Sequence, residues 1–218
     1  MTDNSLAKDA DGSFWQRVRD ALDNLRPMRS DASMGYRQAA MARAIGLKQK
    51  LGAQIDAELA SGWAAAAGRH VSLSLLVIEL DLMNDYGACY GKDALDDAIA
   101  AVTAVLVRGL PRASDSCLRL GQSSFVVVLP DMPVLMARAT AAKYHEAIRE
   151  LGLQHKESHV GLVTASMGLA VSNPRGSYDR KFFEAAAEAV KRAQRKGLGR
   201  IETTDLRPAQ ERKRARRA

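Results

Sequence analysis

The sequence predicts an α/β domain with a central mixed five-stranded sheet, surrounding helices and an N-terminal helical extension. Apolar runs of strand length alternate with segments of helical periodicity, in the order helix, β, α, β, β, α, β, α, β. In the middle of the chain, the apolar runs 118–120 and 125–130 flank a short polar break that begins at Gly121. Such a pattern is typical of a β-hairpin, so the sheet contains an antiparallel pair beside its crossover connections.

Length and charge divide the chain into three parts. With 218 residues it can form one domain with a full core, which we place at 41–205, between an extension at 1–40 and a basic tail at 206–218. The net charge is +7, but residues 207–218 alone hold six Lys or Arg and one glutamate. The folded part is therefore close to neutral, which argues against nucleic-acid binding except through the tail.

The sequence shows no sign of a membrane span or a disulfide framework. No apolar run approaches the roughly 20 residues that cross a bilayer, and the N-terminus lacks a signal-peptide pattern. Cys89 and Cys117 are too few for a disulfide scaffold and are interpreted as small packing residues. We therefore expect a cytoplasmic protein.

Two helical patterns come first in the chain. Ser13 caps an expected helix that ends before Pro27, with apolar residues on one stripe at Trp15, Val18, Leu22 and Leu25. This stripe could form a homodimer or could pack on the chain's own domain. A longer helical pattern runs from about 34 to 67, with Gly68 as its stop.

The remaining elements follow from the same periodicities. A buried strand at 71–80 leads into Glu79-Leu80-Asp81, where alternation puts both carboxylates on one side. Asn84-Asp85-Tyr86-Gly87 has the composition of a turn. After the turn we expect a helix at 91–108, the hairpin, a helix at 133–151, a strand at 161–171, a helix at 179–196 and a short strand at 200–202.

The hairpin tip carries polar groups but no charge. Its residues after Gly121 are Gln122, Ser123 and Ser124. These side chains offer hydrogen bonds, whereas Mg²⁺ prefers carboxylate oxygens. The tip is therefore not expected to hold a divalent cation.

Five segments in the correct order resemble the GGDEF (diguanylate cyclase) family over roughly 41–203. They are Gly46-Leu47 with Gln49-Lys50, Asn84–Gly87 followed by Gly91, Gly121-Gln122-Ser123-Ser124-Phe125, Val163–Ala170 and Phe182–Ile201. The hairpin motif stands where the family has Gly-Gly-Asp/Glu-Glu-Phe. The resemblance implies a nucleotidyl-cyclase, ferredoxin-like palm.

The resemblance also implies that catalytic groups are missing. In the family, a strand-end aspartate and the hairpin glutamate hold two Mg²⁺ ions on GTP. Here Ser124 replaces the hairpin acid, and only Glu79 or Asp81 could replace the strand acid. Lys92 stands at the position of the guanine-binding acid, and the segment 79–87 is about four residues shorter than in the family.

The family's phosphate-binding lysine and arginine align with Gln194 and Leu198. With these substitutions added to the others, the chain is interpreted as an inactive cyclase without catalytic residues, bound metal or cofactor.

A second family site is retained. Arg112-Ala113-Ser114-Asp115 resembles the Arg-x-x-Asp motif at which cyclic di-GMP inhibits many of these domains, and Lys143 falls where a second basic residue completes it. Arginine can bind a phosphate or a guanine edge with its fork, and aspartate can accept from guanine. The alternative is that Arg112 and Asp115 form only an exposed ion pair.

Other candidates have simpler interpretations. His155 and His159 have a metal-ligand spacing, but their segment has the composition of a solvated loop. Three functions remain: a cyclic di-GMP receptor acting on an unidentified protein partner, a nucleotide-independent interaction or dimerisation scaffold, and, least supported, an active diguanylate cyclase.

Overall fold

The computed structural model of the chain describes residues 51–209, with side chains from residue 53. The helix expected from Ser13, the extension at 1–40 and the last nine residues of the tail lie outside this range. The helices are α3 (Leu51–Gly68), α4 (Met83–Tyr90), α5 (Lys92–Arg108), α6 (Val134–Glu150) and α7 (Lys181–Arg195). The predicted stop of the long N-terminal helical pattern at Gly68 is confirmed.

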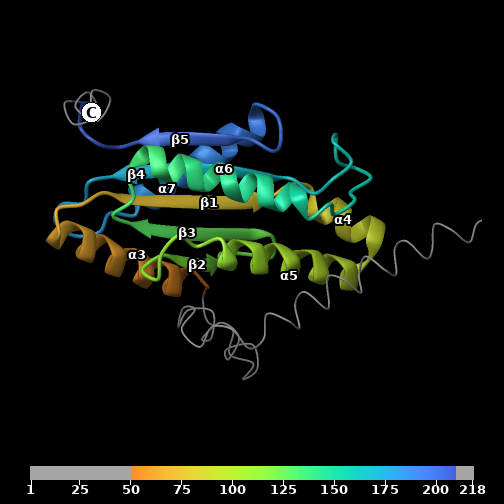
Figure 1. Ribbon diagram of the computed structural model, residues 1–218, viewed down its shortest axis with the longest axis horizontal. Coiled ribbons are helices and arrows are strands. Elements are labelled where there is room, and N and C mark those ends of the chain that lie inside the picture. The colour runs from red at the N-terminus through yellow and green to blue at the C-terminus, as the bar shows by residue number, and fades with distance from the viewer. Residues whose placement is uncertain (1–50, 210–218) are drawn as a thin grey trace, which may run out of the picture. The chain divides into compact units, whose positions relative to one another are not determined.

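Five strands form one mixed sheet, as predicted, in the order β2-β3-β1-β4-β5. They are β1 (Leu73–Leu80), β2 (Ser116–Arg119), β3 (Ser124–Pro130), β4 (Ala165–Ser172) and β5 (Ile201–Asp205). All neighbours are antiparallel except β4 and β5, which run parallel. Helices cover both faces of the sheet (Figure 1).

The central strand β1 is buried on both faces because its residues alternate between two apolar layers. Leu73, Leu75 and Val77 belong to a core cluster with residues of α3 and α7. The intervening Leu76 and Ile78 are fully buried on the opposite face. The near-continuous apolar run of β1 therefore reflects a central strand in a two-sided core.

Helix α7 packs unusually closely on β4. A Cβ atom added at Gly168 would overlap the main-chain oxygen of Ala186 and lie 2.5 Å from the main-chain nitrogen of Val190. Only glycine allows this approach, which brings Phe182 and Val190 into the core.

The predicted turn at Asn84–Gly87 is wrong, because these residues lie inside α4. Leu82 has a left-handed backbone (φ 56°) that ends the strand and starts the helix. Met83 and Tyr86, three residues apart, are both buried and anchor the helix, which ends at Gly91 with φ 86°. Tertiary burial of these two side chains overrides a composition that favours a turn.

The other boundaries agree with the prediction within a few residues, with two exceptions. Strand β4 begins at Ala165 rather than Gly161, since Leu162 instead forms an isolated bridge with Gln154. Strand β5 extends to Asp205, beyond the predicted end at Glu202, because it pairs with β4 along its length.

Candidate functional site

The end of β1 carries a buried carboxylate that is fully occupied by protein donors. Asp81 is 4% exposed, and its Oδ1 accepts a 2.7 Å hydrogen bond from Ser166 Oγ. Its Oδ2 accepts from Thr164 Oγ1 (2.8 Å) and from the main-chain N–H of Gly199 (3.0 Å). Asp81 thus ties β1 to the segment before β5 and to the start of β4, and its oxygens are not open to a ligand.

The hairpin tip faces the same end of the sheet. Glu79 pairs with Ser124 across β3 and with Ser166 across β4, so these three side chains share one face. Glu79 is only half-buried and Ser124 is neutral. Of the two carboxylates expected here, Asp81 already accepts hydrogen bonds from protein donors, so only Glu79 could coordinate a metal ion. One carboxylate beside a neutral serine does not fit two Mg²⁺ ions.

The Arg119 side chain bonds to the main chain of the hairpin tip. Its Nε donates to the carbonyl oxygen of Gly121 (2.8 Å), and its Nη2 donates to that of Gln122 (2.6 Å). The main-chain N–H of Leu80 in β1 donates to Ser123 O (2.9 Å). The main-chain carbonyl groups of Gly121, Gln122 and Ser123 are therefore used to hold the conformation of the tip.

The other positions that the resemblance assigned to the nucleotide lie on helices near this edge. Asn84 is exposed on α4, Lys92 is the exposed first residue of α5, and Gln194 is half-buried near the end of α7. Asp96 lies one turn after Lys92 on the same helix and is also exposed.

A pocket of about 230 Å³ lies at the opposite end of the sheet, before β2 and after β3. It brings together two of the three residues expected to bind a ligand, Arg112 and Lys143. The remaining lining is apolar apart from Thr140, and comprises Gly109, Pro111, Met132, Met136, Ala139 and Thr140. The pocket combines two cationic side chains with an apolar wall, a suitable composition for a flat ring that carries negative charge.

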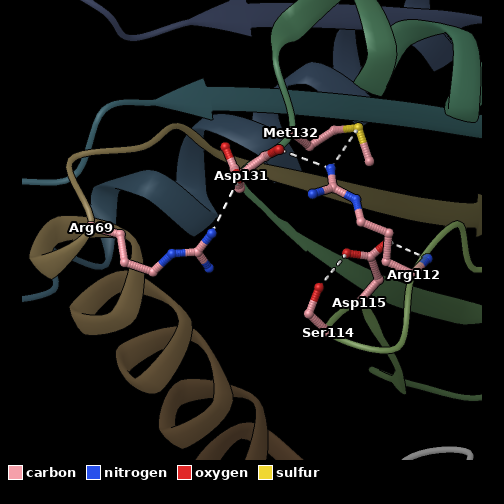
Figure 2. A network of polar contacts seen from close by, with 6 residues as sticks. All are labelled: Arg69, Arg112, Ser114, Asp115, Asp131 and Met132. Carbon is pink, nitrogen blue, oxygen red and sulfur yellow. Dashed lines mark hydrogen bonds and ion pairs between the residues drawn. The ribbon is translucent and has the colours of Figure 1, made fainter.

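Arg112 and Asp115 do not form the exposed ion pair considered from the sequence. Asp115 is 4% exposed, and its Oδ2 accepts a 3.0 Å hydrogen bond from the main-chain N–H of Arg112 (Figure 2). Its Oδ1 accepts from Ser114 Oγ at 3.5 Å. Asp115 therefore shapes the loop that presents Arg112.

The guanidinium of Arg112 lies on the turn that follows β3. Its Nη2 donates to the carbonyl oxygen of Asp131 (2.8 Å) and lies 3.5 Å from Met132 Sδ (Figure 2). The carboxylate of Asp131 pairs with Arg69, just after α3, at 3.2 Å. None of these contacts could be read from the sequence.

Burial raises the pKa values of two groups on the chain segment that follows Arg112. Burial raises the pKa of the Asp115 carboxyl above its ordinary value of 3.8, against the lowering effect of the Arg112 charge and of its hydrogen bonds. Burial also raises the pKa of the Cys117 thiol to about 12, so it stays protonated and unreactive. Cys89 is exposed, which corrects its assignment as a packing residue.

The histidine loop is more ordered than its composition predicted. His155 is buried, and its Nε2 is 3.0 Å from Leu82 O, while His159 is exposed. The ring of His155 meets Tyr86 of α4 edge-on, with centroids 5.3 Å apart. Within residues 51–209, no three His, Cys, Asp or Glu side chains converge as metal ligands would. In the same range, no helix is long and apolar enough to cross a membrane.

Known proteins resemble this chain over more than half of its length. It is 30% identical over 129 residues to the probable diguanylate cyclase DgcC of Escherichia coli K12. The aligned residues are 59% of this chain and 34% of that protein. Diguanylate cyclase A of Treponema denticola is 24% identical over 130 residues, which is 60% of this chain and 34% of that protein. The chain thus spans about a third of the length of these curated relatives.

Solved structures share the fold. The GGDEF domain of DgcB from Caulobacter crescentus, solved in complex with c-di-GMP, superposes with a TM-score of 0.62 at 22% identity, covering 68% of this chain and 85% of that one. Diguanylate cyclase SiaD from Pseudomonas aeruginosa, solved with its activator SiaC, superposes with a TM-score of 0.61 at 20% identity, covering 92% of this chain and 79% of that one. The family model "Diguanylate cyclase, GGDEF domain" matches residues 53–200, more than half of the chain, which therefore belongs to the GGDEF domain family.

Proposed function

We propose that this chain is a catalytically inactive GGDEF domain that serves as a regulatory receptor for cyclic di-GMP. The ligand binds at Arg112 and Lys143, on the loop that Asp115 shapes, and the complex acts on a protein partner in the cytoplasm. The observation that carries the proposal is that Arg112 and Lys143, from two separate segments, line the same pocket.

The missing negative charge supports inactivity. Two-metal nucleotidyl transfer needs carboxylates that hold the Mg²⁺ ions, and those ions neutralise and position the phosphates. Asp81 gives both oxygens to protein donors, and Ser124 offers a hydroxyl where the family has an acid. Glu79 alone would not hold the two Mg²⁺ ions that compensate the triphosphate charge. Loss of one such electrostatic group typically costs about 10²–10³ in rate, and several are lost here.

The size and chemistry of the pocket support partial enclosure of a dinucleotide. At about 230 Å³, it is smaller than the roughly 300–1,000 Å³ of sites that enclose a drug-sized ligand. One guanine with its neighbouring phosphate would lie against Met132 and Met136, with charge supplied by Arg112 and Lys143. The rest of the ligand would remain on the surface, where a partner could contact it.

Two relatives give this proposal its context. The structure of the DgcB domain contains c-di-GMP, and the structure of SiaD contains a protein activator. The proposal extends both properties, binding of c-di-GMP and action through a protein partner, to this chain.

Calorimetric titration with cyclic di-GMP tests the binding. Wild type is expected to bind, and Arg112→Ala and Lys143→Ala to bind at least about tenfold more weakly, because each loses a charged contact to phosphate. The matched control is Arg138→Ala, which removes an equal charge from an exposed position of α6 outside the pocket lining. A loss of affinity in Arg138→Ala equal to that in Arg112→Ala would contradict binding in the pocket.

GTP turnover with Mg²⁺ or Mn²⁺ tests the inactivity. We expect no cyclic di-GMP product, and any product would overturn the assignment. A wild-type protein that neither binds cyclic di-GMP nor turns over GTP would instead favour the interaction scaffold.

A further inference from the structure

The arginine that is proposed to bind the ligand is held away from it in this structure. We infer that Asp131 and Met132 latch the Arg112 guanidinium, and that ligand binding requires this latch to open. The inference rests on the proposed function and adds an autoinhibitory contact to the same pocket.

The geometry of the guanidinium makes the contact inhibitory. Arginine binds a phosphate or a guanine edge through two neighbouring N–H groups, using either Nε with Nη2 or Nη1 with Nη2. Both two-pronged edges therefore include Nη2. In Arg112 this nitrogen faces two protein acceptors, the carbonyl oxygen of Asp131 at 2.8 Å and Met132 Sδ at 3.5 Å. Neither edge is complete for a ligand until Nη2 is released.

The backbone of Asp131 aims its carbonyl group at Arg112. Asp131 has φ 52°, in the left-handed region that few non-glycine residues adopt. Its N–H donates to Ser72 O at 2.7 Å, and the next carbonyl, that of Met132, accepts from Ser74 Oγ at 2.7 Å. The carboxylate of Asp131 pairs with Arg69 at 3.2 Å. The turn is therefore tied to the segment before β1 while its carbonyl holds Arg112 (Figure 2).

The latch lowers the apparent affinity of the pocket. When only a fraction of molecules is competent to bind, the apparent Kd rises by the inverse of that fraction. The net free energy of a hydrogen bond to a charged group corresponds to a preference of about tenfold or more for the latched state. A change that opens the turn should consequently tighten binding, although it adds no contact to the ligand.

A pair of substitutions at one position separates the latch from the ion pair. Asp131→Gly and Asp131→Val both remove the carboxylate that pairs with Arg69. Glycine keeps the left-handed turn, whereas a β-branched residue disfavours it and redirects the carbonyl group. Met132→Leu nearly preserves volume but removes the sulfur acceptor.

Calorimetry with cyclic di-GMP gives the main readout. We expect Asp131→Val to bind about five- to tenfold more tightly than Asp131→Gly, and Met132→Leu to bind about twofold more tightly than wild type. Asp131→Gly should remain within about twofold of wild type. Equal or weaker binding by a folded Asp131→Val than by Asp131→Gly would overturn the latch.

A second readout needs neither ligand nor variant. In the free wild-type protein, nitrogen-detected NMR should resolve two distinct Nη signals for Arg112, because a held Nη2 rotates slowly. A single averaged signal would overturn the latch. This test remains decisive even if Asp131→Val does not fold.

The two hypotheses fail in different ways. Wild-type binding that depends on Arg112, without a gain in Asp131→Val, removes the latch and leaves the receptor function intact. Absence of binding in wild type and in every variant removes the receptor function and the latch with it. Binding by Asp131→Val where wild type shows none supports both.

Discussion

The two ends of the sheet treat their charged groups in opposite ways. At the end where β1 terminates, Asp81 is buried and accepts three hydrogen bonds from Thr164, Ser166 and Gly199. At the end where β1 begins, Arg112 and Lys143 line an open pocket of about 230 Å³. At the first end a carboxylate ties three segments of the chain together, while at the second end two cations line a pocket.

This difference indicates where a ligand can act. A buried charge surrounded by protein donors is stabilised by them and has little to offer a ligand. Lys143, an exposed cation at the edge of the pocket, is stabilised by water and can exchange that water for a phosphate. The family's catalytic end is therefore expected to serve stability in this chain, and the pocket end to serve recognition.

Substitution at Asp81 should produce the largest effect. Asp81→Ala leaves two hydroxyl groups and one main-chain N–H without their acceptor in a buried position, so we expect a loss of about 3–5 kcal/mol in the free energy of unfolding. Urea denaturation measures this loss. Glu79→Ala, on the same face but half-buried, is the control and should cost less than about 1 kcal/mol. Equal losses would show that the Asp81 network is not special.

Changes at Lys143 should sharpen the pocket end. Lys143→Glu reverses the charge and is expected to weaken cyclic di-GMP binding more than about tenfold, whereas Lys143→Arg supplies a fork and should tighten it several-fold. Calorimetry measures both. Because Lys143 is exposed on α6, neither variant should change the thermal midpoint appreciably. Unchanged affinity in Lys143→Glu would place the ligand elsewhere.

A smaller effect is expected from the protonation of Asp115. Because burial raises its folded-state pKa above the ordinary 3.8, the ionised carboxylate disfavours folding at neutral pH. This penalty is fully present above the folded pKa and disappears as pH falls through it toward the unfolded value. As the pH is lowered from 7 to about 4, the free energy of unfolding of wild type should therefore rise relative to that of Asp115→Asn. Urea denaturation of both proteins across this range measures the difference, and a fall would contradict the sign.

The smallest expected effect is none. Ser124→Glu returns a carboxylate to the hairpin tip, opposite Glu79, but leaves Asp81 held by its three donors. We expect no GTP turnover with Mg²⁺, measured as cyclic di-GMP formed. Product from this single variant would show that the catalytic end is only one residue away from activity.

The sequence predicted the sheet better than it predicted either site. The Val-rich run around Val126 and Val128 specified a buried strand because local periodicity and burial agree there. The turn predicted at Asn84–Gly87 failed because the burial of Met83 and Tyr86 decides that segment. Local composition cannot report burial against distant elements.

The side-chain networks depend on contacts between distant residues. Thr164, Ser166 and Gly199 reach Asp81 across sequence separations of 83, 85 and 118 residues, respectively. The contact between Arg112 and the Asp131 carbonyl joins two loops through the backbone, which carries no residue-specific signal. Motif spacing did identify Arg112 and Lys143 as candidates for one site, because family resemblance preserves such offsets where periodicity does not.

NMR titration of the wild-type protein with cyclic di-GMP tests the contrast between the two ends most directly. Amide shifts are expected around Arg112, Met132, Met136 and Lys143, with none at Glu79 or Ser124. Saturable shifts centred on Glu79 and Ser124, with the pocket residues unmoved, would contradict the account.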